Sequence, residues 1–357
     1  MKLGLNCLCL SAILSLSPAA YGQETDQSQE NYPYLIQMKV EGFFSNTDGT
    51  AIGTFKESVS GSIIRSEDKI YILSVAHMTR NVYVKRVDVF FADGRASTEA
   101  QFVGASDVFD VSLWKFKNKD FVYDGEVLEI DETSTLKSGE EITALGSPFG
   151  VDFGVNFCET KGTIIHPKFR PNKQCNNPDF ILHSAIINSG NSGGPLLNKG
   201  GKLVGINFSV INGNIKSPFS SNMYAAVPAS DILRLIPKMA LNKSIKHGWI
   251  GGLTVDNSAR VPKSEFDNLQ VEQPRNNVPI ITYVHPGGIA DKAGLEIGDI
   301  VLEVAGEKIL DYKDFMREIM HRAPMEMVDI KVLRDGAELT LAIELTEFPY
   351  QQPTFAK

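Results

Sequence analysis

The chain has 357 residues and a formal net charge of -8 at pH 7, and its sequence pI is near 5.4. Hydrophobic residues make up 43% and charged residues 22% of the sequence, which indicates a folded globular protein and argues against a disordered chain or a fibrous repeat. An acidic chain without a long cluster of lysine and arginine offers no surface for phosphate backbones, so no nucleic acid partner is expected.

Residues 1–22 have the pattern of a secretory signal peptide. Lys2 precedes the apolar run Leu3–Leu16, and the small residues Ala20 and Gly22 fit a signal-peptidase site. The apolar run is shorter than the ~20 residues that a membrane-spanning helix needs, and an uncleaved anchor is the alternative interpretation. The leader predicts export, either to the periplasm or to the extracellular medium.

Cleavage of the leader would leave two cysteines, Cys158 and Cys175, in an oxidising compartment. An even pair in such a compartment is a candidate disulfide. Two free thiols are the alternative, because a sequence does not show whether two Cα atoms come within about 7 Å of each other.

Many short runs rich in β-branched and aromatic residues follow, separated by Gly, Pro, Asn and Asp turns. Their length and composition favour strands over helices. Because no helical segment separates them, they predict a mostly β protein with a barrel or sandwich rather than a doubly wound sheet. The runs are Tyr34–Met38, Gly61–Ile64, Ile70–Ser74, Val87–Phe91, Val111–Trp114, Glu141–Leu145, Gly162–Ile165, Phe180–Leu182 and Leu203–Ile206.

The first clear helix is Ala229–Ile236, which places Ile232, Leu235 and Ile236 on one face. We expect this helix to close a first domain, residues 23–240. A chain of this length is expected to form two domains, because single hydrophobic cores stop growing at about 250–300 residues.

The second domain is expected at residues 241–348, with a tail at 349–357. The polar stretch Lys238–Gly248 before it has the composition of a linker. The domain should contain a helix at Tyr312–His321 and a final hairpin that turns at Asp335-Gly336. Its predicted strands are Ile280–Val284, Ile300–Val304, Asp329–Leu333 and Leu339–Glu344.

The strongest local motif is the glycine-rich segment Gly190–Pro195, which contains Ser192. A serine hydroxyl is a poor nucleophile at neutral pH and needs a base, together with donors for the oxyanion that forms on attack. Glycines let the backbone turn so that the amides of Gly190, Asn191 and Ser192 can converge on one point as an oxyanion hole. A glycine-rich surface turn is the alternative interpretation.

A base and its orienting carboxylate are available elsewhere in the chain. His77 ends an apolar strand-like run, whereas the other histidines lie in loops, at strand ends or in amphipathic stretches. Asp110 begins another apolar run, where a carboxylate is costly to bury unless it is hydrogen-bonded. In a catalytic triad such an aspartate fixes the imidazole tautomer and stabilises the imidazolium. Asp107 is the alternative aspartate.

These three pieces, in the order His77, Asp110 and Ser192, resemble the HtrA/DegP family of trypsin-like serine proteases. The resemblance implies a trypsin-like double six-stranded β-barrel with the triad in the crevice between the barrels, and a serine endopeptidase that needs neither cofactor nor metal. The matching segments are Ser74–His77, Asp110–Leu113, Gly146–Gly150, Ala185–Asn188 and Gly190–Leu196.

The sequence departs from the family pattern at a few positions. Met78 stands where the family usually has valine, Ser184 where it usually has aspartate, and Ser60–Ile64 lacks one glycine-serine repeat. None of these changes touches proton transfer. The segment Ser209–Asn222, which shapes substrate pockets in the family, is divergent, so the preferred substrate side chain is not predicted.

A second resemblance, to PDZ domains (α+β), is carried by Ala293–Gly306 and the preceding Pro286–Ala290. It implies that a loop formed by Trp249, Ile250, Gly251 and Gly252 binds the terminal carboxylate of a peptide, while the adjoining strand edge accepts the peptide as an added strand. The alternative is a plain β-rich domain with a tight turn. The insertion Asp256–Asn277 is long for this fold.

The family resemblance has two regulatory implications. Ile165–Phe180 would be the sensor loop that relays signals to the oxyanion hole, and a Cys158–Cys175 disulfide would tether it with on the order of 3 kcal/mol of chain-entropy stabilisation. Aromatic residues such as those of Tyr32–Leu35 support a homotrimer, or a multiple of it, in the family. Simple packing on the first barrel is the alternative for this segment.

Two other functions compete with proteolysis. The G-x-S-x-G elbow of an esterase needs a helix directly after the serine, and Gly193-Gly194-Pro195 would break one. A non-cleaving chaperone or PDZ adaptor would not need the triad residues. The sequence therefore predicts an exported serine endopeptidase that cleaves unfolded or misfolded proteins in protein quality control and is regulated by C-terminal peptides.

Overall fold

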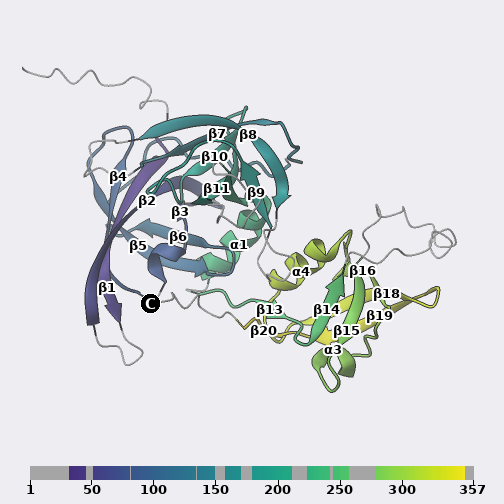
Figure 1. Cartoon of the computed structure of the whole chain (residues 1–357). Helices are drawn as coiled ribbons and strands as arrows, with labels where there is room; N and C mark the ends of the chain where they lie inside the picture. The colour runs from purple at the N-terminus through teal and green to yellow at the C-terminus, as the bar shows by residue number, and fades with distance from the viewer. Residues whose placement is uncertain are drawn as a thin grey trace, which may run out of the picture.

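The computed structural model describes residues 32–45, 51–80, 82–133, 135–148, 157–169, 179–210, 223–241, 244–256 and 279–349. Figure 1 shows a larger β-rich domain, coloured purple to teal, and a smaller domain in green and yellow. The predicted signal peptide and all but one residue of the predicted tail lie outside the described residues. None of the helices in the described ranges is both long and apolar enough to cross a membrane.

The first barrel is a closed, fully antiparallel sheet in the order β1-β2-β3-β6-β5-β4. Its strands are β1 (Leu35–Ser45), β2 (Ala51–Ser66), β3 (Lys69–Ser74), β4 (Val82–Phe91), β5 (Thr98–Ser106) and β6 (Val111–Phe116). The apolar runs found in the sequence are buried, and because neighbouring residues such as Ile72 and Leu73 face opposite sides of a strand, both faces of β3 are covered. Leu113 of β6 is fully buried as well. Trp114 is buried as well, and its indole N–H is satisfied because it donates to Ser112 Oγ at 2.9 Å.

The second barrel closes in the order β10-β11-β12-β9-β8-β7. Its strands are β7 (Glu141–Gly146), β8 (Cys158–Phe169), β9 (Phe180–His183), β10 (Pro195–Asn198), β11 (Leu203–Val210) and β12 (Tyr224–Pro228). Two closed six-stranded barrels confirm the predicted double-barrel class. Closure also pairs every strand on both sides, which removes exposed sheet edges.

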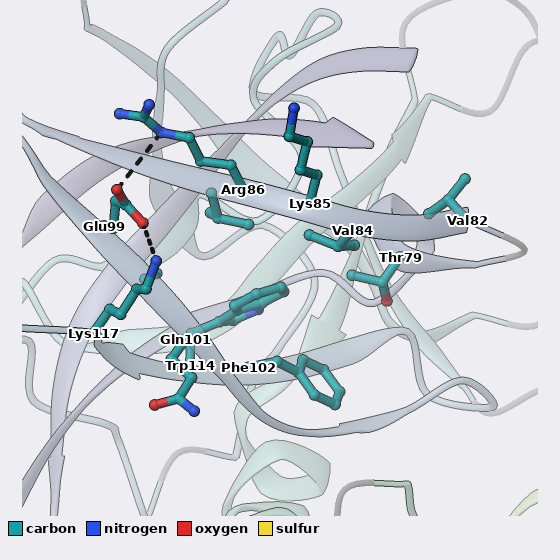
Figure 2. A pocket seen from close by; sticks show the side chains of 12 residues that line it. Thr79, Val82, Val84, Lys85, Arg86, Glu99, Gln101, Phe102, Trp114 and Lys117 are labelled. Carbon is teal, nitrogen blue, oxygen red and sulfur yellow. Dashed lines mark hydrogen bonds and ion pairs between the residues drawn. The ribbon is translucent and has the colours of Figure 1, made fainter. Parts of the chain in front are cut away.

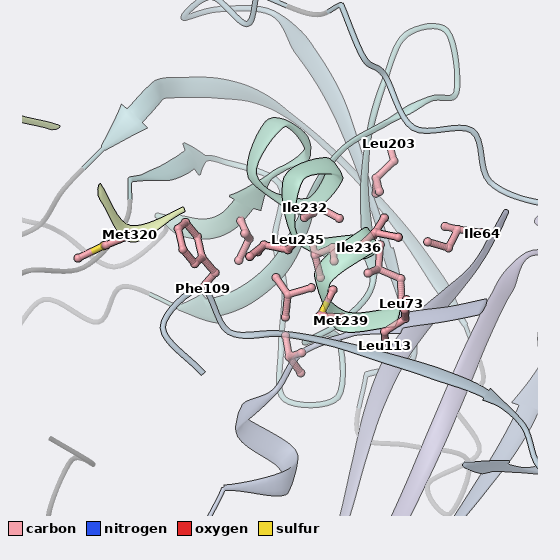
Figure 3. Packing of buried hydrophobic residues seen from close by; sticks show 14 of the residues in the cluster. Ile64, Leu73, Phe109, Leu113, Leu203, Ile232, Leu235, Ile236, Met239 and Met320 are labelled. Carbon is pink, nitrogen blue, oxygen red and sulfur yellow. The ribbon is translucent and has the colours of Figure 1, made fainter. Parts of the chain in front are cut away.

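Helix α1 (Ala229–Leu241) follows the second barrel directly. Figure 3 shows its side chains Ile232, Leu235 and Ile236 between Ile64 of the first barrel and Phe109. The helix continues past Ile236, where the sequence predicted its end, and runs through Pro237. Proline removes one helical hydrogen bond, but Met239 beyond it is completely buried in the core, and this burial favours the extra turn.

The second domain is built on a sheet in the order β14-β15-β16-β18-β19, with β17 paired to β16 and β14 at one edge. The predicted turn at Asp335-Gly336 is confirmed: both residues have positive φ, 49° and 79°, as a tight two-residue hairpin requires. The elements are β13 (Gly248–Trp249), β14 (Leu253–Asp256), β15 (Ile280–Val284), α3 (Ile289–Lys292), β16 (Ile300–Val304), β17 (Glu307–Lys308), α4 (Tyr312–Met320), β18 (Met327–Arg334), β19 (Ala337–Glu344) and β20 (Thr346–Glu347).

Polar side chains join the two domains where α1 meets the region around α4. Arg234 makes two hydrogen bonds of 2.6 Å with the carboxylate of Glu318. Asp231 Oδ1 lies 2.9 Å from His321 Nε2, and both side chains are buried. We call this cluster, with the buried His247 described next, the domain seam.

The stretch predicted to be a linker is held in place. Ser244 pairs with Ala105 of β5, and the Ile245 amide donates to the Ala105 carbonyl at 2.9 Å. His247 is buried, with Nδ1 2.7 Å from the Met320 carbonyl and Nε2 2.8 Å from Ser106 Oγ. A polar composition alone did not distinguish a free linker from a segment that is hydrogen-bonded to both domains.

Candidate active site

His77 and Asp110 form a hydrogen-bonded pair at one end of the first barrel. His77 begins the short 3₁₀ helix η2 (His77–Thr79) after β3, and Asp110 immediately precedes β6. Because β3 and β6 are antiparallel neighbours, with Ser74 opposite Ser112, the two residues meet at adjacent strand ends. Nδ1 of His77 lies 2.7 Å from Oδ2 of Asp110, and the backbone N–H of His77 donates to Oδ1 at 2.7 Å. This bond leaves Nε2 of the imidazole available as a base.

The pair is shielded from solvent, and this sets the basicity of the imidazole. Burial lowers the pKa of His77, but the hydrogen bond and the charge of Asp110 more than offset it, so that the pKa lies above the ordinary value of 6.5. Glu57 raises the pKa further, whereas Arg80 lowers it. The environment therefore stabilises an imidazolium, the species that forms when the histidine removes a proton from a nucleophile.

Ser192 lies in the loop between β9 and β10 of the second barrel, and this loop is held against the first barrel. The backbone N–H of Ser60, in β2, donates to the Ser192 carbonyl at 2.7 Å. Gly193 has a φ of 88°, and a Cβ at this position would lie 2.0 Å from the Ser60 carbonyl oxygen. Only glycine satisfies both conditions, so this part of the motif is required by close backbone approach. We call the contact region of Ser60, His77, Asp110 and Ser192 the barrel seam.

The hydroxyl of Ser192 is directed toward the Phe208 carbonyl, with 3.4 Å between the two oxygens. Within the described residues no hydrogen bond joins it to His77. In ligand-free enzymes catalytic hydrogen bonds are often long or poorly aligned and tighten only in the substrate complex. In this structure the His77–Asp110 hydrogen bond is formed, whereas the Ser192 hydroxyl is directed at the Phe208 carbonyl and not at His77.

The three predicted oxyanion donors differ in their availability. The amide of Asn191 donates to the Asn188 carbonyl at 3.0 Å and is already used in a turn. The amides of Gly190 and Ser192 donate to no described residue. The Gly190 carbonyl accepts a hydrogen bond of 2.7 Å from Ser60 Oγ, which fixes the peptide that follows. The candidate oxyanion hole therefore has two free backbone donors, the amides of Gly190 and Ser192, instead of the three that were predicted.

Two polar residues at the barrel seam were not singled out in the sequence. Ser60 is fully buried and binds both the Gly190 and the Ser192 carbonyls. Arg80, three residues after His77, lies 3.2 Å from Oδ1 of Asp110 and also contacts Asp107, the alternative aspartate. Neither residue type signals such a role by itself, because the partners lie far away in the sequence.

Only one of the two cysteines of the predicted disulfide lies among the described residues. Cys158 is a free cysteine in this structure and is partly buried, and burial raises the pKa of its thiol. Cys175 lies outside the described residues, as does most of the predicted sensor loop, so the bridge and the tether stay predictions. Residues 149–150, 211–222 and 257–277 of other predicted segments also lie outside the described ranges.

The N-terminal aromatic segment packs on the barrels. Tyr34 is buried, and the hydroxyl of Tyr32 donates to Glu159 at 2.8 Å. The hydroxyl of Tyr123 donates to the Pro33 carbonyl at 2.9 Å. Packing within the chain therefore accounts for these residues, and a trimer contact stays a prediction.

The predicted carboxylate-binding loop connects β13 with β14. Trp249 packs edge-on against Phe348 with 5.1 Å between ring centroids, and Ile250 is buried. Gly252 has a φ of 75°, and its carbonyl accepts from the His285 amide at 2.7 Å. The amides of Ile250, Gly251 and Gly252 donate to no described residue. The residues with free backbone amides thus directly precede the edge strand β14 in the chain.

A cavity of about 470 Å³ lies in the wall of the first barrel, between β4 and β5. Figure 2 shows Trp114 and Phe102 beside it and Glu99 between Arg86 and Lys117. Glu99 lies 2.5 Å from Lys117 and 3.8 Å from Arg86, so these three charges are paired. No residue of the barrel seam lines this cavity, and we assign it no part in the chemistry. Among the described residues no cluster of histidine, cysteine, aspartate and glutamate could hold a metal ion.

Comparisons with known families match both domains. Residues 59–206 match the trypsin-like peptidase domain, and residues 266–345 match the PDZ domain. The peptidase match includes all three proposed triad residues. The PDZ match begins after the Trp249–Gly252 loop.

Individual proteins agree with these domain matches. The chain is 29% identical to a probable periplasmic serine endoprotease DegP-like of Hahella chejuensis over 82% of this chain and 58% of that protein. It is 26% identical to the periplasmic serine endoprotease DegP of Escherichia coli over 93% of this chain and 66% of that protein. The chain thus spans a little over half the length of the first of these relatives.

A solved structure described as the HtrA-type protease AlgW with tripeptide superposes with a TM-score of 0.64 at 25% identity, covering 91% of this chain and 97% of that one. The similarity to the sequence relatives and to the structural neighbour therefore extends over most of this chain. The chain therefore contains a trypsin-like peptidase domain followed by a PDZ domain, and over most of its length it is similar to DegP-like serine endoproteases and to HtrA-type protease structures.

Proposed function

We propose that this chain is an exported serine endopeptidase that cleaves unfolded or misfolded polypeptides, with His77, Asp110 and Ser192 as its triad. The observation that carries this proposal is the 2.7 Å bond between His77 Nδ1 and Asp110 Oδ2 at the end of the first barrel. The glycine loop of Ser192 is fastened to the same barrel through Ser60.

The reaction would proceed through an acyl-enzyme. Nε2 of His77 takes the proton of the Ser192 hydroxyl while Oγ of Ser192 attacks the scissile carbonyl carbon. Asp110 stabilises the imidazolium that results. The amides of Gly190 and Ser192 donate to the oxyanion. His77 then protonates the leaving amine and, in the second half, removes a proton from the water that releases the acyl group.

The second domain would bind the C-terminus of a peptide. The open amides of Ile250, Gly251 and Gly252 suit a terminal carboxylate, and β14 offers an unpaired edge for an added strand. Occupancy of this groove would regulate cleavage, since the helix α4 of the same domain also contacts α1 of the protease domain.

Location and assembly follow from the family and the leader. The names of the relatives support a periplasmic protein, and residues 1–22 would be the cleaved signal peptide. A homotrimer or a multiple of it is the assembly that the resemblance implies.

The decisive experiment compares wild type with Ser192→Ala on denatured casein. We expect the variant to lose cleavage entirely and to keep its unfolding midpoint and its affinity for a C-terminal peptide, because only the nucleophile is removed. Ser230→Ala, on the exposed surface of α1, is the matched control and should cleave at the wild-type rate. Cleavage that persists in Ser192→Ala excludes this nucleophile, and a wild type that binds casein without cutting it favours the chaperone or adaptor alternative.

A further inference from the structure

The side chain of Arg80 connects the two loops that carry the His77–Asp110 pair. Arg80 directly follows η2, which begins with His77. Its Nη2 lies 3.2 Å from Asp110 Oδ1 and 2.5 Å from the Asp107 carbonyl, and its Nε lies 3.4 Å from Asp107 Oδ1. The side chain of Arg80 is 22% exposed and that of Asp110 only 11%, so this contact is largely shielded from water.

Asp110 needs such support because its own backbone is strained. Its φ is 58°, in the left-handed region that is unfavourable for a non-glycine residue. A residue in this region persists only when its surroundings determine it. Here Oδ1 accepts from both the His77 amide and Arg80, which leaves Oδ2 directed at Nδ1 of the imidazole.

We propose that Arg80 is a positioning residue for the triad: it clamps the Asp107–Asp110 turn, orients the carboxylate of Asp110 toward His77, and moderates the attraction between that carboxylate and the imidazolium. Arg80 can act on catalysis in this way only if the proposed function holds. Arg80 has no bond to Ser192 among the described residues, so its effect passes through Asp110.

The charges that face His77 give the direction of the effect. Asp110 and Glu57 both raise the pKa of His77, and Arg80 is the cation that opposes them. A histidine acts as a base only in its neutral form, which dominates above its pKa. In Arg80→Gln the backbone N–H of His77 still holds Oδ1 of Asp110, so the loss of the cation should raise the pKa of His77 and move the acid limb of the pH–rate profile to higher pH.

The test compares wild type with Arg80→Gln and Arg80→Lys across pH 5.5–9, with casein cleavage followed as kcat/KM. For Arg80→Gln we expect a loss of roughly 10-fold or more at the optimum, in kcat rather than KM. The midpoint of the acid limb should rise by about 0.5–1 pH unit. Arg80→Lys should restore the wild-type midpoint of the acid limb, because lysine keeps the positive charge. It should restore only part of kcat, because lysine lacks the planar guanidinium that contacts Asp107 and Asp110 together.

Arg86→Gln is the matched control, since it removes the same charge from the same barrel at a side chain that is 54% exposed and paired with Asp88. Its pH profile should equal that of wild type. An Arg80→Gln variant with an unchanged acid limb and an unchanged kcat overturns the role of Arg80. A loss that is accompanied only by a lower unfolding midpoint, with no movement of the limb, also overturns it.

Titration of His77 by NMR separates failure of this inference from failure of the proposed function. The imidazole resonances report the pKa of His77 whether or not the protein cleaves casein. If wild type proves inactive, a higher His77 pKa in Arg80→Gln still supports the role of Arg80 in orienting and balancing the pair, and an equal pKa refutes it.

Discussion

The buried polar side chains of the barrel seam and those of the domain seam differ in their hydrogen bonding. At the domain seam most groups are matched: Arg234 takes both oxygens of Glu318, and each ring nitrogen of His247 has a partner, whereas Nδ1 of His321 is buried without one among the described residues. At the barrel seam two amides stay open and three backbones, at Asp110, Gly190 and Gly193, have positive φ. Paired polar groups stabilise the contact between the two domains. Free N–H donors and strained turns, in contrast, can hold the negative charge that develops in a transition state.

The largest effect should come from Asp110→Asn, which tests the barrel seam. Asparagine keeps the shape of the side chain but can present N–H to Nδ1, which favours the wrong imidazole tautomer. We expect kcat to fall by about 10⁴-fold with little change in the unfolding midpoint. Asp107→Asn, in the same turn, is the control and should retain most of the activity. Equal losses in the two variants would mean that Asp110 is not the orienting carboxylate.

Acid should weaken the folded state through buried histidines. Burial lowers the pKa of His183 and of His247 to about 4 and also lowers that of His321. Between pH 6.5 and 4 the unfolded chain binds these protons and the folded chain does not, so stability is complete above pH 6.5 and falls as the pH drops. Each of the first two residues should contribute on the order of 2–3 kcal/mol of loss by pH 4.

Urea unfolding at pH 7, 6, 5 and 4 measures this loss. Protonation of His77 stabilises the folded state as the pH falls, because its pKa is raised, but it is one group against three. The variant His247→Gln should be less stable at pH 7 and show a flatter pH dependence than wild type. A pH dependence as steep as that of wild type would show that His247 does not remain neutral in the folded protein.

The smallest predicted effect concerns the matched charges of the domain seam. Arg234→Ala leaves the buried carboxylate of Glu318 with only Arg317, whose Nε lies 3.7 Å away, and we expect a loss of about 1–3 kcal/mol, reduced because Arg234 is 36% exposed. Lys246→Ala removes an exposed ion pair with Glu347 and should cost less than about 0.5 kcal/mol. If both variants lose the same amount of stability, the domain seam is no more tightly matched than the open surface.

Strands, turns and motifs that depend on neighbouring residues could be predicted from the sequence, whereas contacts between residues far apart in the chain could not. Short β-type runs and the Asp335-Gly336 turn are local, and the double barrel and the hairpin are confirmed. The family motifs also identified His77, Asp110 and Ser192 as the candidates. The clamp at Arg80 was not predicted, since only the fold brings an arginine of one loop to an aspartate of another.

Two further differences have the same origin. Asn191 was expected to donate to an oxyanion, but its amide is used by a turn to Asn188, a choice of backbone hydrogen bond that glycine content does not reveal. The helix α1 runs past Pro237 because Met239 is buried by residues that are far away in the sequence. Packing decides both cases.

The four contacts of Ser60 have a consequence for when the protein can become active. Its amide, hydroxyl and carbonyl bind Ser192, Gly190, Ser147 and Ser74, so one residue early in the chain completes the shape of a loop encoded much later. The nucleophile loop has no finished form until the first half of the protease domain has folded beneath it. A chain in which only one of the two barrels has folded lacks these contacts, so we expect it to show no proteolytic activity.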